Sequence, residues 1–189
     1  DKVVKESISI SFINRLGIFI GVVGAIIKVI ASIFLKSSSN LFSMINIYGT
    51  IVQGESSASG QKMNWNGKGS IFHQMNYFKN YYPSFFEKII DCQMATINIK
   101  LNKKLNIKSW EYTFDQVYWL PNSNTWYEKL SFTPIIFIYK YQQVNAWLYK
   151  AYKSPHKNND FLVEVISPYI EDLRTKQICE LKINEKYFK

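Results

Sequence analysis

The stretch that decides the fold is DCQMATINIKL, residues 91–101. In its second half, polar residues alternate with three apolar residues, Ile97, Ile99 and Leu101. This period-2 pattern predicts a β-strand with one buried face. The other face carries Thr96 and Asn98, whose side chains lie roughly 7 Å apart on a strand that rises about 3.3 Å per residue. They either face water on a half-solvated strand or form half of a metal–phosphate site.

Short strands of the same kind fill the chain from about residue 45. β-Branched and aromatic runs predict them at Ile45–Gln53, Thr96–Leu101, Glu111–Phe114, Val117–Leu120, Thr125–Leu130, Pro134–Tyr139, Val144–Tyr149, Phe161–Ile166 and Glu180–Ile183. Gly54–Gly69 predicts a long loop, Pro121–Asn124 a hairpin connection, and Pro83–Ile90 one short helix. Many short strands without a strand–helix–strand rhythm indicate a mainly β fold, a barrel or a sandwich.

The N-terminal segment has a different character. Leu16–Leu35 is apolar except for Lys28 and Ser32. A bilayer needs about 20 such residues. The lysine costs about 2.5–3.5 kcal/mol on insertion, and each large apolar residue returns roughly 0.3–0.6 kcal/mol. The sum favours a membrane helix over a buried soluble helix or a cleaved signal sequence. We therefore divide the chain into residues 1–40, an apolar helix with its linker, and residues 41–189, a β domain.

Composition narrows the class of ligand. The net charge is +9, from 23 basic and 14 acidic residues, which suits phosphate-bearing ligands, anionic lipid or nucleic acid. The two cysteines, Cys92 and Cys179, have no CxxC spacing, and His73 and His156 lie far apart in sequence. These spacings argue against a zinc site and against a disulfide framework.

Two further stretches carry side chains suited to phosphate chemistry. Gly54–Lys62 (GESSASGQK) follows a strand, and its small residues let backbone N–H groups approach a phosphate that Lys62 would neutralise. A surface loop that only turns is the alternative. Glu164 lies inside an apolar strand, where it could accept a hydroxyl proton as a general base or pair with a lysine at a barrel rim. Thr96 and Asn98 present the hard oxygen ligands that Mg²⁺ prefers.

These pieces, in this order, resemble the archaeal-type CTP-dependent riboflavin kinase family. That family has a strand, a glycine-rich loop, a short helix, a G-T-x-N strand and a T-x-H…E-I-I-A-P segment. The counterparts here are IYGTIVQG (Ile47–Gly54), ATINIKL (Ala95–Leu101) and KSPHKNNDFLVEVISP (Lys153–Pro168). Ala95 stands where the family has glycine, and Ser154 replaces the family's threonine but keeps its hydroxyl. The resemblance covers residues 45–184.

The resemblance implies a fold, a reaction and a set of site residues. The fold would be a small six-stranded Greek-key β-barrel with one short helix. The reaction would transfer the γ-phosphate of CTP to the 5′-hydroxyl of riboflavin, giving FMN and CDP. Thr96 and Asn98 would bind Mg²⁺, while Ser154 and Glu164 would contact the flavin, with Glu164 as the catalytic base. The nucleotide would be held by Gly54, Glu55, Ser59, Gly60, Gln61, Lys62, Tyr169, Ile170, Glu171 and Asp172.

Two other functions stay open on the sequence alone. A diverged barrel that binds flavin or nucleotide without turnover fits the sparse glycines of Gly54–Lys62. A nucleic-acid binder driven by the +9 charge ranks last, because the basic residues are dispersed, so no nucleic-acid partner is expected. The leading expectation is a riboflavin kinase whose barrel lies in the cytoplasm, where CTP is, and is tethered to a membrane through residues 16–35.

Overall fold

Antiparallel strand pairing organises the part of the chain that the structure describes. The computed structural model describes residues 43–54, 68–120, 125–154, 156 and 158–189. Met44–Lys189 forms one compact unit. Its described residues contain strands β1 (Met44–Val52), β2 (Ile97–Leu101), β3 (Tyr112–Val117), β4 (Glu128–Tyr139), β5 (Gln142–Ala151), β6 (Leu162–Ile166) and β7 (Ile178–Asn184).

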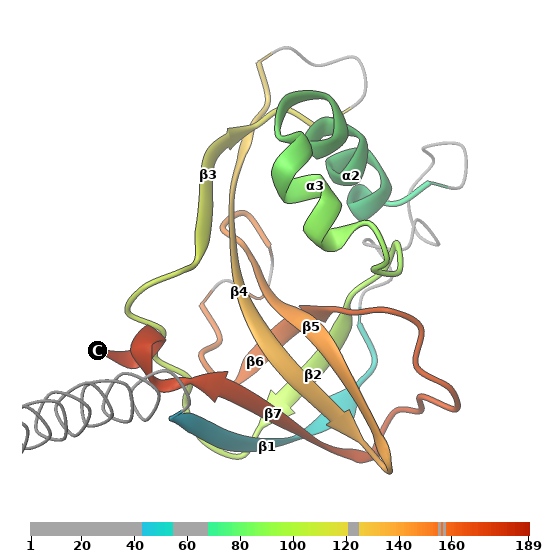
Figure 1. Cartoon of the computed structure of the whole chain (residues 1–189), viewed down its shortest axis with the longest axis vertical. Coiled ribbons are helices and arrows are strands. Elements are labelled where there is room, and N and C mark those ends of the chain that lie inside the picture. Colours follow the sequence, from blue (N-terminus) through green and yellow to red (C-terminus); the bar gives the residue numbers. More distant parts are fainter. Residues whose placement is uncertain (1–42, 55–67, 121–124, 155, 157) are drawn as a thin grey trace, which may run out of the picture. The chain divides into compact units, whose positions relative to one another are not determined.

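Six of the strands form a closed ring, because the last strand in the order pairs again with β4. The order is β3-β4-β5-β6-β2-β1-β7, and β7 also pairs with β4, so six strands form a ring while β3 lies beside β4 (Figure 1). The first part of β4, Glu128 to Phe132, pairs with β3, and a later part, Ile135 to Ile138, pairs with β7. Pro134 falls between the two stretches, where its missing N–H removes no ladder hydrogen bond on that edge.

Alternation along the strands separates two apolar cores. The inner core lies within the ring and includes fully buried side chains from β1, β2, β4, β6 and β7, among them Ile47, Ile99, Phe137, Val165 and Leu181. The outer core lies on the opposite face and is built largely from aromatic rings. Because successive side chains of a strand point to opposite faces, β4 and β5 contribute to both cores.

Two helices cover the outer core. Helices α2 (Ser70–Tyr81) and α3 (Pro83–Ile89) lie together beside β3 and the first half of β4 (Figure 1). Phe78 and Phe85 extend from the helices onto Phe132 of β4, with the Phe85 and Phe132 ring centroids 4.8 Å apart. Ring pairs at this separation add to the stabilisation that comes from burial itself. A short 3₁₀ helix, η1 (Glu185–Phe188), follows β7.

The mainly β fold class is confirmed, and several predicted elements are wrong. The expectation of one short helix missed α2, because its sequence SIFHQMNYFKNY has few strong helix formers. Its only helical signal is the spacing of the buried residues Ile71, Met75 and Phe78. The strand predicted at Val117–Leu120 is absent, since β3 ends at Val117. The strands predicted at Thr125–Leu130 and Pro134–Tyr139 are parts of one strand, β4.

Some predictions lie outside the described residues. These are the apolar segment Leu16–Leu35, the hairpin connection Pro121–Asn124, and residues 55–67 of the predicted long loop. Within the described ranges, none of the helices is both long enough and apolar enough to cross a membrane.

Candidate functional site

The candidate site is a row of side chains across neighbouring strands on the outer face of the ring. Asn98 of β2 is the register partner of Val52 on β1 and of Glu164 on β6. Glu164 is in turn the partner of Tyr149 on β5. Directly opposed residues of antiparallel strands project from the same face. Tyr149 belongs to the outer core, so Asn98 and Glu164 share that outer face.

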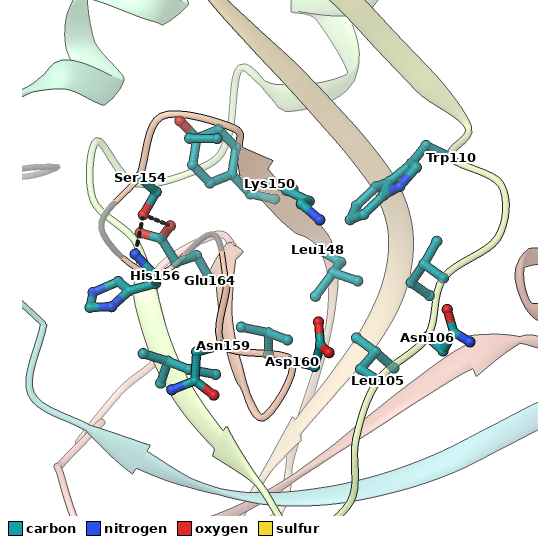
Figure 2. Close-up of a pocket in the computed structure, with 15 residues that line it drawn as sticks. Leu105, Asn106, Trp110, Leu148, Lys150, Ser154, His156, Asn159, Asp160 and Glu164 are labelled. Carbon is teal, nitrogen blue, oxygen red and sulfur yellow. Dashed lines mark hydrogen bonds between the residues drawn. The ribbon is translucent and has the colours of Figure 1, made fainter.

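The Glu164 carboxylate joins two segments that are distant in sequence. Thr96, just before β2, donates its hydroxyl to Glu164 Oε1 at 3.3 Å. Ser154, just after β5, donates its hydroxyl to Glu164 Oε2 at 3.2 Å (Figure 2). The backbone N–H of His156 donates to Ser154 Oγ at 3.2 Å, which fixes the hydroxyl in this orientation. Three of the residues predicted for the site therefore meet at one carboxylate.

Asn98 carries a buried oxygen with no protein partner. The residue is 7% exposed, and its Oδ1 atom makes no hydrogen bond. A buried polar atom without a partner is costly, so such an atom in a native structure indicates a missing ligand or water. Glu164 is the register partner of Asn98, and Thr96, two residues before Asn98, bonds to Glu164, so the three residues offer oxygen donors of the kind that Mg²⁺ prefers. No cluster of three or more His, Cys, Asp or Glu side chains among the described residues offers an alternative metal site.

Gly54 lies against the Asn98 amide. A Cβ atom at position 54 would lie 2.2 Å from Asn98 Nδ2 and 3.0 Å from Asn98 Cγ. Only a residue without a side chain fits there while the amide keeps its position. Gly54 is the first residue of the predicted nucleotide loop, and the other predicted residues of that loop, Glu55, Ser59, Gly60, Gln61 and Lys62, lie outside the described residues.

A pocket opens at the end of the ring where β5 ends and β6 begins. Its cavity volume is about 140 Å³. Trp110 and Leu105 lie on one side, and Ser154, His156 and Glu164 lie on the other (Figure 2). Asn106, Lys150, Asn159 and Asp160 also line the pocket (Figure 2). Apolar side chains mixed with convergent polar groups are found in many small-molecule sites. A cavity of this volume encloses part of a flavin-sized ligand, so the remainder of such a ligand would extend beyond it.

The fourth predicted segment, Tyr169–Asp172, lies toward the other end of the ring. Tyr139 donates its hydroxyl to the Asp172 carbonyl oxygen at 2.9 Å, and Gln142 exchanges hydrogen bonds with the backbone of Glu171. Ile170 is 6% exposed and packs into the inner core, so only its backbone remains for a ligand. Tyr169 and Glu171 are exposed. The antiparallel registers place the start of β2 and the end of β1, next to Gly54, at this same end.

Tyr149 is a site neighbour that the sequence did not reveal. It is 6% exposed and donates its hydroxyl to Gln74 Oε1 of helix α2 at 2.9 Å. Burial raises the pKa of Tyr149 well above its usual range, and the negative charges of Glu164 and Glu128 raise it further. The phenol is therefore neutral at physiological pH, and it ties α2 to the row that contains Glu164.

Glu128 is a second carboxylate near Glu164 that the sequence did not reveal. It is 4% exposed, and burial raises its pKa. Its Oε1 accepts the Lys153 backbone N–H at 2.8 Å, and its Oε2 accepts the Trp119 indole N–H at 3.3 Å. The sequence offered no signal for it, because a single glutamate at a strand start is commonly a surface residue.

Comparison with known proteins adds no relative. No protein-family model matches the chain, and no curated protein matches its sequence at a significant level. The function of this chain is therefore inferred from its own residues. These are the Thr96–Glu164–Ser154 hydrogen bonds, the buried Asn98 oxygen and the pocket beside them.

Proposed function

We propose that this chain is a riboflavin kinase of the CTP-dependent archaeal type, and that its ring of six strands is the Greek-key barrel of that family. The observation that carries the proposal is the position of Glu164 between two regions. The pocket with Trp110 lies on one side of Glu164. Asn98 and Gly54 lie beside Glu164 across the strands, and the segment 169–172 lies toward the other end of the ring. A hydroxyl presented from the pocket and a phosphate presented from the other end would meet at this carboxylate.

The chemical step needs a base and a positioned hydroxyl. The riboflavin 5′-oxygen forms a bond to the γ-phosphorus of CTP, and the bond between that phosphorus and the β,γ-bridging oxygen breaks, releasing CDP. Glu164 takes the proton of the attacking hydroxyl. Thr96 and Ser154 hold the two carboxylate oxygens in place by their hydrogen bonds. Catalysis of phosphoryl transfer is otherwise largely positioning and charge stabilisation.

The Asn98 amide and the Thr96 hydroxyl would hold Mg²⁺. The ion, when bound, would neutralise negative charge on the phosphates of CTP. Asn98 suits this role because its Oδ1 is already buried and without a protein partner, so a metal would satisfy it. The Gly54–Lys62 loop and Tyr169–Asp172 would bind the nucleotide. The domain would work in the cytoplasm, with residues 16–35 as a membrane anchor.

The test is FMN formation by site variants of the full chain. Riboflavin, Mg²⁺ and CTP are incubated with wild-type protein, Asn98→Ala and Glu164→Gln, and FMN is separated from riboflavin by chromatography. We expect wild-type turnover and a loss of at least about 100-fold in Glu164→Gln, the lower range for removal of a catalytic acid–base group. Asn98→Ala removes a proposed Mg²⁺ ligand, and we expect it to lose at least about tenfold. Asn46→Ala and Glu180→Gln are the matched controls, because both lie on ring strands outside the site.

Riboflavin fluorescence, measured on the same proteins, separates turnover from binding. FMN formation that survives in both Asn98→Ala and Glu164→Gln would contradict the assigned roles. If the wild type forms no FMN but still quenches riboflavin fluorescence, the chain is a flavin-binding barrel without kinase activity.

A further inference from the structure

The turn that carries Ser154 is fastened to the start of β4 by three hydrogen bonds. The backbone N–H of Tyr152 donates to the Lys129 carbonyl oxygen at 3.1 Å. The backbone N–H of Lys153 donates to Glu128 Oε1 at 2.8 Å. The Lys153 ammonium donates to the Tyr127 carbonyl oxygen. Among these acceptors, only Glu128 contributes a side chain.

Glu128 is itself held rigidly. Its second oxygen accepts the Trp119 indole N–H at 3.3 Å, and Trp119 is 9% exposed. The Trp119 ring packs edge-on against Trp126, with centroids 5.0 Å apart. Both oxygens of a carboxylate that is 4% exposed thus have fixed partners. A group held in this way can set the position of the backbone that donates to it.

Lys153, whose backbone N–H bonds to Glu128, directly precedes Ser154 of the candidate site. Ser154 donates its own N–H to the Ala151 carbonyl oxygen at 3.1 Å, which closes the turn. Its hydroxyl donates to Glu164 Oε2. A shift of Lys153 would therefore move the Ser154 hydroxyl away from Glu164 and from the pocket that both residues line.

We propose that Glu128 is a positioning residue for the reaction. It holds the Lys153 backbone so that the Ser154 hydroxyl meets both Glu164 and the riboflavin hydroxyl. This inference depends on the kinase function proposed above. Glu128 does not contact the substrate and acts entirely through Ser154. Its replacement should therefore change the kinetic constants for riboflavin and not those for CTP.

A double-mutant cycle tests this dependence. Glu128→Gln and Glu128→Ala are each made in wild-type residues 1–189 and in Ser154→Ala, and kcat/KM for riboflavin is measured with saturating CTP. In the wild-type background we expect a loss of about tenfold for Glu128→Ala and a smaller loss for Glu128→Gln, which keeps an acceptor for the Lys153 N–H. In the Ser154→Ala background we expect a loss of under about twofold, because the group that Glu128 positions is already gone.

Glu111→Gln is the matched control for a merely structural glutamate. Glu111 also accepts two hydrogen bonds, but from Lys186 and Tyr187 near the C-terminus. Its replacement should leave kcat/KM unchanged in both backgrounds at a temperature where every variant is folded. Equal losses of kcat/KM from Glu128→Ala in both backgrounds, or an equal rise in KM for CTP, would overturn the positioning role. A wild type that does not phosphorylate riboflavin would overturn the proposed function, and with it this inference.

Discussion

At the scale of single residues, the contact between Gly54 and Asn98 links the first residue of the proposed nucleotide loop to the candidate metal ligand. Gly54→Ala would force a Cβ atom to within 2.2 Å of Asn98 Nδ2 unless the amide moves. We expect the amide to move, and the Mg²⁺ concentration at half-maximal activity to rise about tenfold with little change in melting temperature.

Gly49 offers the contrasting glycine. A Cβ atom at Gly49 would meet Ile99 Cγ2 at 2.5 Å and the Lys100 backbone oxygen at 2.9 Å, away from the Asn98 amide. Gly49→Ala should therefore lower the melting temperature and leave the Mg²⁺ dependence of the remaining folded enzyme unchanged. The reverse pattern in the two variants would contradict the assignment of Gly54 to the site.

Glu111 makes the stability of the domain depend on pH. Hydrogen bonds from Lys186, at 2.8 Å, and from Tyr187, at 2.7 Å, lower the pKa of its carboxyl in the folded state. The unfolded chain therefore binds more protons in the acid range, and the stabilisation by Glu111 is present above the ordinary glutamate pKa of about 4.3. It is lost as the pH falls through the lowered folded pKa.

Denaturant unfolding at several acid pH values measures this effect. We expect the free energy of unfolding of the wild type to fall with decreasing pH over this range, and the slope to be smaller in Glu111→Gln. Parallel curves for the two proteins would show that the Glu111 contacts do not contribute.

At the scale of elements, the aromatic contacts of α3 hold the helix pair against the sheet. Phe85 is 4% exposed, and its ring centroid lies 5.0 Å from that of Phe78 and 4.9 Å from that of Phe114. Phe85→Ala should reduce the free energy of unfolding by about 3–5 kcal/mol, the usual cost of removing a buried phenylalanine. Phe161→Ala is the control, since Phe161 is 48% exposed and should cost far less. Similar losses in both variants, measured by urea unfolding, would contradict this packing.

The elements that the sequence predicted well are those with a strict period. The alternating strand predicted at Thr96–Leu101 is β2, which begins one residue later, at Ile97. Pro83 begins α3 as expected. Helix α2 was missed because its helical face consists of three apolar residues among polar and aromatic ones, and its stability comes from the outer core. The sequence predicted two strands where the structure has one, β4, because a proline inside a strand usually ends it. In the assembled sheet Pro134 lies where β4 changes its partner from β3 to β7, and the sequence alone does not show this change.

Some residues of the candidate site could be predicted from the sequence and others could not. Thr96, Asn98, Ser154 and Glu164 carry their chemistry in the side chain and lie in short patterned stretches, so sequence could single them out. Glu128 and Tyr149 act through contacts made across strands and with α2. Those contacts depend on register, which a sequence pattern without a neighbouring strand does not specify.

At the scale of the whole molecule, the reactivity of the two cysteine thiols measures the unfolding of each core separately. Cys92 belongs to the outer core and Cys179 to the inner core, and burial raises the pKa of each thiol to about 12. Thiolate is the reactive form, so neither should react with a thiol reagent at pH 8 in the native protein. Because β4 and β5 contribute to both cores, we expect both thiols to become reactive in the same denaturant range. Exposure of Cys92 well before Cys179 would show that the outer core unfolds independently.

In the proposed reaction, Glu164, Thr96, Asn98 and the pocket beside them transfer a phosphate to riboflavin. In the most direct test, residues 1–189 are incubated with riboflavin, Mg²⁺ and, separately, CTP, ATP, GTP and UTP, and FMN and the nucleoside diphosphate are quantified together. We expect equimolar FMN and CDP with CTP as the preferred donor, and no product without Mg²⁺. A folded protein that yields no FMN with any of the four donors would contradict this proposal.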